Sequence, residues 1–320
     1  MNKLLPTHYK LYNYLHSAIL FAGMVVLLCI TGWLLAGPSG IAWFLLAGAL
    51  IFISASRLTP QIILRLHRAK ILQPGDAPRL YEVITKLAER AKVKQIPVLY
   101  YIPGSMINAF TTGLNKSAVI ALSDGMLRQL NTRELTGVLA HEISHISSND
   151  LFVMLLADII SRLTSIMAFA GYILIWIYIP QFILMDIKVP WMLLFVLIMA
   201  PSFSLLMQMA LSRAHEFNAD IEAAKLTGDP LGLASALEKI EYYQGGWIER
   251  IFIPYRRMRE PALLRSHPLM LDRVNRLKEL ASQMQPSGHF FDSSEKHDRV
   301  QFPSPEKVSP GRFSGLWRYC

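Results

Sequence analysis

The residues of this chain best suited to chemistry lie between Leu139 and Ile146. His141, Glu142 and His145 follow the order His-Glu-x-x-His in this stretch. Two histidines four positions apart lie on one face of an α-helix, where they can bind the same metal ion. A glutamate beside the first histidine can act as a general base and take a proton from an attacking water. The pattern therefore predicts a zinc-dependent hydrolase, and peptide hydrolysis is the favoured reaction.

Apolar residues surround this motif at helical spacing. They are Leu135, Val138, Leu139, Ile143 and Ile146. A helix buried by these residues would carry three titratable side chains into the interior, which costs free energy unless something compensates for it. A bound metal ion supplies that compensation. Asn131 or Thr132 is the predicted N-cap of this helix, and the helix is expected to continue toward the next apolar run.

A third metal ligand is needed, because a catalytic zinc ion takes three protein ligands and leaves one position open. The segment Ser212–Asp220 offers it, since Glu216 and Asp220 are four positions apart and share a helix face. We predict that Glu216 binds the metal and that Asp220 accepts a hydrogen bond from the outer nitrogen of a ligand histidine, with His141 favoured. His215 lies about 100° from Glu216 around the helix and is predicted to stay outside the ligand set. The alternative is an acidic helix face exposed to solvent.

The composition of the chain is that of a protein with lipid-facing segments. Of its 320 residues, 52% are hydrophobic and 17% are charged, whereas soluble domains carry about 25% charged residues. The deficit is concentrated in long apolar runs, which predicts an integral membrane protein with a water-facing part. The net charge of +9 does not come from basic residues interleaved with aromatic ones, so nucleic-acid binding is not predicted. Cys29 and Cys320 have neither disulfide-framework nor zinc-ligand spacing.

Four apolar runs predict four transmembrane helices arranged as two hairpins. The runs are Ala18–Ala36, Ile41–Ser54, Leu163–Ile179 and Trp191–Met209. A turn at Gly37–Gly40 joins the first two, so the first run is predicted to remain as a span and not to be cleaved as a signal peptide. Lysines and arginines lie outside the two hairpin loops, Lys188 excepted, which predicts that both termini and the soluble segments face the cytoplasm. Two buried core helices of a soluble enzyme are the alternative for the second hairpin.

The segments between the runs predict an α+β catalytic part with a small sheet inside a mainly helical protein. Helical spacing covers Pro78–Lys92, and strands are predicted over Pro97–Ile102, Asn108–Thr112 and Ala118–Leu122, the last two joined as a hairpin. The two transmembrane hairpins are predicted at 1–57 and 151–211. The catalytic domain is predicted to be divided between 58–150 and 212–284. A disordered, proline-rich tail is predicted at 285–320.

Four blocks of sequence, in this order, resemble the HtpX family of membrane-bound zinc metalloproteases, within the larger group that includes CAAX prenyl endopeptidases. The blocks are Asn108-Ala109-Phe110 with Gly113, Glu134–His145, Ser212–Asp220, and Ser266-His267-Pro268 with Arg273. The resemblance covers about Leu58–Leu280. It implies a zincin-like core that holds one zinc ion per chain, with Glu142 as the base.

The resemblance also implies roles for residues that the pattern alone leaves open. It implies that His141, His145 and Glu216 are the zinc ligands, and that His267 helps to stabilise the oxyanion, although Ser-His-Pro could equally form a turn. It implies that Asn108 and Ala109 contact the substrate backbone beside an edge strand, although they could also be ordinary strand residues.

The same resemblance implies proteolytic quality control of membrane proteins at the cytoplasmic face of a bacterial inner membrane. The protein and peptide substrates and the lipid bilayer would then be the partners of the chain. A CAAX-type prenyl-peptide endopeptidase is the nearest alternative, and a non-catalytic membrane scaffold or metal sensor is another. A transporter is disfavoured, because Asp158 and Arg162 lie at the edge of an apolar run rather than inside it. The sequence gives no indication of the natural substrates or the oligomeric state.

Overall fold

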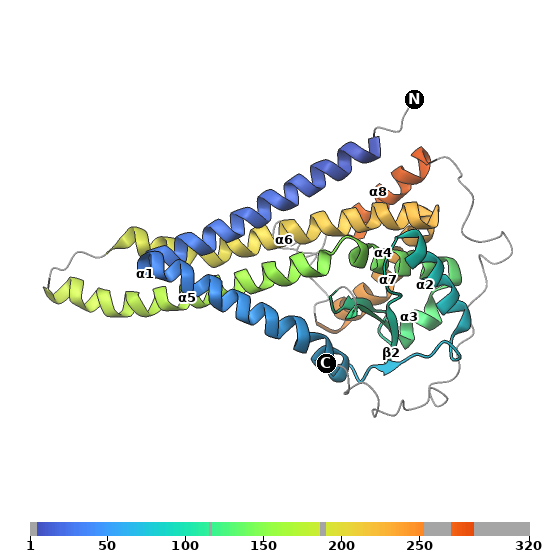
Figure 1. Ribbon diagram of the computed structural model, residues 1–320, viewed down its shortest axis with the longest axis horizontal. Helices are drawn as coiled ribbons and strands as arrows, with labels where there is room; N and C mark the ends of the chain where they lie inside the picture. Colours follow the sequence, from blue (N-terminus) through green and yellow to red (C-terminus); the bar gives the residue numbers. More distant parts are fainter. Residues whose placement is uncertain (1–4, 115–116, 186–189, 253–269, 285–320) are drawn as a thin grey trace. The chain divides into compact units, whose positions relative to one another are not determined.

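The computed structural model describes residues 5–114, 117–185, 190–252 and 270–284. These residues form two compact units (Figure 1). One, the apolar unit, consists mainly of the long helices. The other, the sheet unit, contains the β-sheet, the shorter helices and the ends of two long helices, at 57–66 and 219–227. Each unit has its own hydrophobic core.

The apolar unit is built from three helices that are long and apolar enough to cross a membrane, counted over the described residues. They are α1 (Leu5–Leu66), α5 (Asp150–Met185) and α6 (Trp191–Thr227). Buried side chains from all three pack together, among them Met24, Leu28, Ile160, Leu163, Leu197 and Leu211. Large apolar side chains elsewhere on these helices remain exposed, as Trp176 does with 80% of its surface. Such a surface is suited to contact with lipid.

Helix α1 folds back on itself at a break between its two arms. Ala36 and Gly37 leave helical φ/ψ, and Gly37 has a φ of +62°. A Cβ atom added at Gly40 would lie 2.0 Å from the carbonyl oxygen of Gly32, whereas residues eight positions apart in a straight helix are separated by about 12 Å. The turn predicted at Gly37–Gly40 is therefore present, and the first of the three apolar helices consists of two arms.

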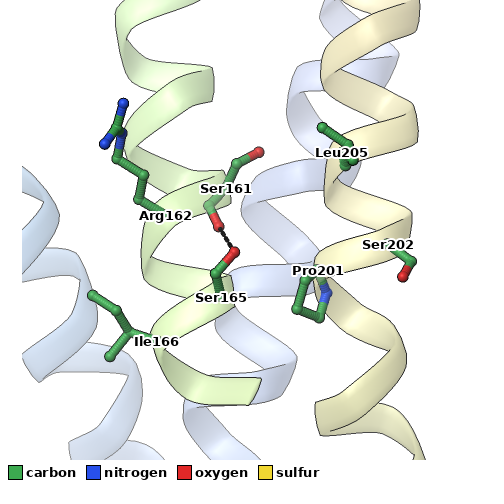
Figure 2. A pocket seen from close by; sticks show the side chains of 7 residues that line it. All are labelled: Ser161, Arg162, Ser165, Ile166, Pro201, Ser202 and Leu205. Atoms are coloured by element: carbon green, nitrogen blue, oxygen red, sulfur yellow. Dashed lines mark hydrogen bonds between the residues drawn. The ribbon is translucent and has the colours of Figure 1, made fainter. Parts of the chain in front are cut away.

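A groove of about 560 Å³ lies between α5 and α6 within the apolar unit. Its lining, drawn in Figure 2, consists of Ser161, Arg162, Ser165, Ile166, Pro201, Ser202 and Leu205. The hydroxyls of Ser161 and Ser204 are 3.0 Å apart, and Ser165 donates to the carbonyl oxygen of Ser161. Nε of Arg162 donates to Asp158 at 2.7 Å. Most of these polar groups are thus hydrogen-bonded within the apolar unit, and none belongs to the predicted metal site.

The sheet unit contains four strands in the order β1-β2-β4-β3. They are β1 (Lys70–Ile71), β2 (Val98–Ile102), β3 (Ala109–Thr112) and β4 (Val119–Ser123). β2 and β4 run parallel, and β3 pairs antiparallel with β4 at the edge of the sheet. The three predicted strands and their hairpin are confirmed, whereas β1, which has two residues, was not predicted.

Among the described residues, five helices lie wholly within the sheet unit. They are α2 (Pro78–Arg90), α3 (Asp124–Gln129), α4 (Thr132–Ser147), α7 (Pro230–Phe252) and α8 (Met270–Gln283). Buried side chains of the sheet and of these helices share one core, which includes Leu80, Ile84, Leu99, Ile120, Leu139 and Leu237. The histidine motif lies on α4, whose turns are buried almost throughout, so the core fixes the position of this helix.

The first turn of α4 is fixed by hydrogen bonds. Asn131 is the N-cap and forms a capping box with Glu134. The Glu134 carboxylate also accepts hydrogen bonds from Ser235 at 2.6 Å and from Lys239 at 2.7 Å, both on α7. Burial alone would raise the pKa of Glu134, but the bonds from Lys239, Ser235 and the Asn131 backbone outweigh it and hold that pKa below its usual value. Glu134 therefore ties the start of α4 to α7 as an ionised group.

The expectation that α4 continues toward the next apolar run is wrong. α4 ends at Ser147, and α5 begins at Asp150. Between them, Asn149 adopts a left-handed conformation with a φ of +56°, which asparagine tolerates better than most residues and which ends a helix. This break brings Asp150 beside the end of α4.

Gly137 allows α4 and α7 to approach closely one turn before His141. A Cβ atom added at Gly137 would lie 2.8 Å from the backbone nitrogen of Leu233. Because backbone cannot move aside, Gly137→Ala is expected to lower the stability of the chain by about 1–3 kcal/mol, despite the better helix propensity of alanine. Thermal unfolding in detergent measures the effect. The control is Gly48→Ala, whose added Cβ would meet only the end of the Leu163 side chain, at 3.3 Å. Equal melting temperatures for both variants would contradict the prediction.

Candidate metal centre

The side chains of His141 and His145 converge on one point beside α4. Their Nε2 atoms are 3.2 Å apart, and their rings meet edge to face with centroids 4.7 Å apart. Two nitrogens bound tetrahedrally to one zinc ion at 2.0–2.1 Å would be separated by about 3.3 Å. The spacing of the two nitrogens therefore fits a shared metal ion.

Each histidine is oriented by a carboxylate at its other nitrogen. Nδ1 of His145 lies 2.8 Å from Oδ2 of Asp150, and Nδ1 of His141 lies 3.0 Å from Oδ1 of Asp220. A histidine whose Nδ1–H donates to a carboxylate presents the lone pair of Nε2. Two such lone pairs 3.2 Å apart repel each other unless a cation lies between them, so the donor set fits a divalent metal ion.

Asp220 is buried and forms a second ionic contact, with Arg273 of α8. Nε of Arg273 donates to Oδ2 at 2.8 Å, and its terminal nitrogen donates to Oδ1 at 2.6 Å. This bidentate geometry is the strong form of an arginine–carboxylate pair. Arg273 thus compensates the buried charge of Asp220, while Asp220 orients His141.

Glu216 lies one turn before Asp220 on the same continuous helix, α6. His141, His145 and Glu216 each offer a ligand atom, and these atoms all lie within 4.8 Å of one another. Two imidazoles and one carboxylate are a donor set of catalytic zinc sites, in which the fourth position stays open. His215, the neighbour of Glu216, is buried and is not a member of this group.

Glu142 points from α4 toward the sheet. Its carboxylate is mostly buried, and Oε2 accepts a hydrogen bond from the Thr111 hydroxyl of β3 at 2.5 Å. A glutamate fixed beside the candidate ligand His141 can take and return a proton during hydrolysis. Thr111 was not predicted as part of the site.

The two predicted substrate contacts lie at the start of the edge strand. The backbone N–H of Asn108 donates to the Ser123 hydroxyl at 2.9 Å, and the Ser123 N–H donates to the carbonyl of Asn108 at 3.0 Å. Asn108 keeps an exposed side chain, and Ala109 is half-buried. His267, the predicted oxyanion group, lies outside the described residues.

The comparison with known proteins agrees with this geometry. Residues 74–281 match the sequence pattern of Peptidase family M48. This chain belongs to peptidase family M48. The match spans strands β2 to β4, the histidine motif and α6, so it covers every residue described above at the metal centre.

Relatives of this M48 peptidase extend the likeness over most of its length. It is 33% identical to a protease HtpX homolog of Thermococcus sibiricus over 285 residues, which cover 85% of this chain and 97% of the relative. It is 34% identical to a protease HtpX homolog of Acaryochloris marina over 286 residues, covering 85% and 96%. The resemblance to HtpX proteases is therefore confirmed, and with its apolar helices the chain is a membrane metallopeptidase.

A solved structure shares the fold. The crystal structure of S. mikatae Ste24p matches with a TM-score of 0.50 and 22% sequence identity, over 85% of this chain and 67% of that chain. At this identity the likeness concerns the architecture alone.

Two residues of this M48 peptidase that touch the site were missed by sequence reasoning, and a third had no assigned role. Asp150 was not predicted to lie at the site, and its contact with His145 depends on the left-handed turn at Asn149. The asparagine at position 149 was the available signal, because asparagine can adopt the left-handed conformation that ends a helix. Thr111 could have been found from strand alternation, which places it on the same face as Ala109. Arg273 lay in a matched block, but nothing in the sequence identified Asp220 as its partner.

Proposed function

We propose that this chain is a membrane-integrated, zinc-dependent endopeptidase that hydrolyses peptide bonds of membrane proteins, misfolded ones in particular. One observation carries the proposal. His141, His145 and Glu216 lie close enough together to act as three ligands, and the carboxylate of Glu142 is fixed one residue from the first of them. A structural metal site would need the three ligands but not the fixed glutamate.

The proposed chemistry divides among the residues of the chain. His141, His145 and Glu216 hold the zinc ion, which when bound supplies a Lewis acid for the reacting oxygens. Asp150 and Asp220 keep each ligand histidine in the form that presents Nε2. A water oxygen bonds to the scissile carbonyl carbon while its proton passes to Glu142. The C–N bond then breaks, and Glu142 delivers the proton to the leaving amine.

The proposed binding mode of the substrate follows from the sheet order. β3 is one of the two edge strands and pairs only with β4 among the described residues. An extended peptide can add to such an edge through backbone hydrogen bonds, which would bring it past Asn108 and Ala109 toward Glu142. His267 is proposed as a second group that stabilises the oxyanion.

The proposed topology has four membrane crossings. The two arms of α1 joined at Gly37 are of similar length, and each reaches the roughly 20 residues that a span needs. Together with α5 and α6 they would form the two transmembrane hairpins at 1–57 and 151–211, with the catalytic domain divided between 58–150 and 212–284. The distribution of lysine and arginine supports an orientation in which the termini and the active site face the cytoplasm. The resemblance to HtpX proteases is the basis for proposing a bacterial inner membrane.

Metal removal tests the proposed function. The full chain, purified in detergent, is incubated with an unfolded model protein and with a membrane protein, before and after treatment with a chelator. Cleavage is expected to stop on chelation and to return on addition of Zn²⁺, because the ligands are proposed to hold a reactive metal. Cleavage that persists without metal would refute the proposal.

The rival functions are separated in the same assay. A prenylated peptide and its unmodified counterpart are added as substrates. A prenyl-peptide endopeptidase would cleave only the lipid-modified peptide. A scaffold or metal sensor would bind zinc without cleaving any substrate. The proposed endopeptidase is expected to cleave the unmodified protein.

A further inference from the structure

Strand β3 presents two neighbouring threonines to opposite faces of the sheet. Side chains alternate along a strand, so Ala109 and Thr111 share one face, and Phe110 and Thr112 share the other. Thr111 reaches Glu142 of α4, whereas the ring of Phe110 lies 5.5 Å from that of His67. The same strand therefore carries one hydroxyl aimed at the proposed base and one aimed away from it.

The hydrogen bond from Thr111 restricts the proposed base. At 2.5 Å between Oγ1 and Oε2, it has the short length of a hydroxyl donating to a carboxylate. The glutamate side chain has several rotatable bonds, and ordering them costs free energy. Threonine is a stiff donor, because its branched Cβ limits χ1 and its backbone is held by pairing with Ile120 of β4. One oxygen of Glu142 is thus bound, and the second remains available for a water.

We propose that Thr111 is a positioning residue, whose hydroxyl holds Glu142 in the orientation that proton transfer requires. This inference rests on the proposed function, since Glu142 must act as the base. The role also connects the substrate to the base. A peptide that adds to the edge of β3 pairs with the strand that carries Thr111, so substrate docking and base alignment depend on one element.

The first test separates positioning from substrate binding. Thr111→Val removes the hydroxyl and keeps the branched shape, and it is expected to lower kcat by about 10-fold, the effect of one hydrogen bond to a charged group, with KM and zinc content unchanged. Thr111→Ser is expected to restore most of kcat. Thr112→Val is the matched control, because it removes a hydroxyl from the opposite face of the same strand, and it should leave kcat unchanged.

The second test does not depend on turnover. A peptide hydroxamate binds zinc and donates a hydrogen bond to a neighbouring carboxylate, so its affinity reports the alignment of Glu142. In the zinc-loaded chain, Thr111→Val should weaken hydroxamate binding about 10-fold. In a Glu142→Gln background the same substitution should change nothing further.

Several results would overturn the proposal. They are a raised KM with unchanged kcat, an equal effect of Thr112→Val, no effect of Thr111→Val on the hydroxamate, or an equal loss of hydroxamate affinity in the Glu142→Gln background. Failure of the proposed function looks different, because the wild-type chain would then cleave no peptide while the hydroxamate measurement still decides the role of Thr111.

Discussion

Glu142→Gln is expected to abolish peptide hydrolysis while leaving the metal in place. Glutamine keeps the size of the side chain but cannot accept the proton of the attacking water, and loss of a general base lowers the rate by about 10²–10⁴-fold. His141, His145 and Glu216 are untouched, so the zinc content of the purified chain should equal that of the wild type. The measurement is kcat on a peptide substrate together with metal analysis of the same sample.

A second substitution at the same position supplies the comparison. Glu142→Asp retains a carboxylate on a shorter side chain, so part of the activity is expected to remain although the carboxylate is displaced from Thr111. Hydrolysis at the wild-type rate by Glu142→Gln would show that another group is the base. Loss of zinc from Glu142→Gln would instead assign Glu142 to the metal site itself.

Glu216→Ala is expected to remove the metal from the chain. The substitution takes away one of the three candidate ligands and leaves two imidazoles, and two protein ligands do not hold a catalytic zinc ion. Loss of a residue that hydrogen-bonds to a ligand lowers metal affinity by about 10–100-fold. Loss of the ligand itself is expected to lower the affinity for Zn²⁺ by more than this. Competition with a chelating dye measures the affinity, and no cleavage is needed to observe the effect.

Two further variants calibrate this result. Glu222→Ala removes a different carboxylate of α6, one that accepts a hydrogen bond from Lys225. This variant should leave the affinity for zinc unchanged. Asp150→Asn weakens the contact with His145 and should give the smaller, 10–100-fold loss. Wild-type zinc affinity in Glu216→Ala would mean that the third ligand lies elsewhere in the chain.

Local spacing is the part of the site that a single sequence reveals. His141 and His145 had to lie one turn apart on α4, and Glu216 and Asp220 one turn apart on α6, because the period of the helix fixes such pairs. The apolar face of α2 and the β3–β4 hairpin follow from equally short-range patterns. Each of these features depends on one short, continuous stretch of chain.

The features that were missed depend on distant contacts or on a single backbone angle. Thr111 meets Glu142 because β3 lies at the edge of the sheet beyond β4, and strand order cannot be derived from alternation alone. Arg273 reaches Asp220 from a helix more than 50 positions away. Asp150 reaches His145 because one residue, Asn149, adopts a left-handed conformation. A continuous helix would have placed that carboxylate on a different side of the chain.

The order in which these parts occur along the polypeptide has a consequence for biosynthesis. A ribosome completes both histidines before it reaches Asp150. It reaches Asp220 only after α5 and most of α6 have been made, and Arg273 later still. A nascent or truncated chain that ends before α6 therefore holds the hydrolytic motif without the carboxylate that orients His141. The complete set of groups around His141, Asp220 and Arg273 included, therefore exists only once both long apolar helices have been made.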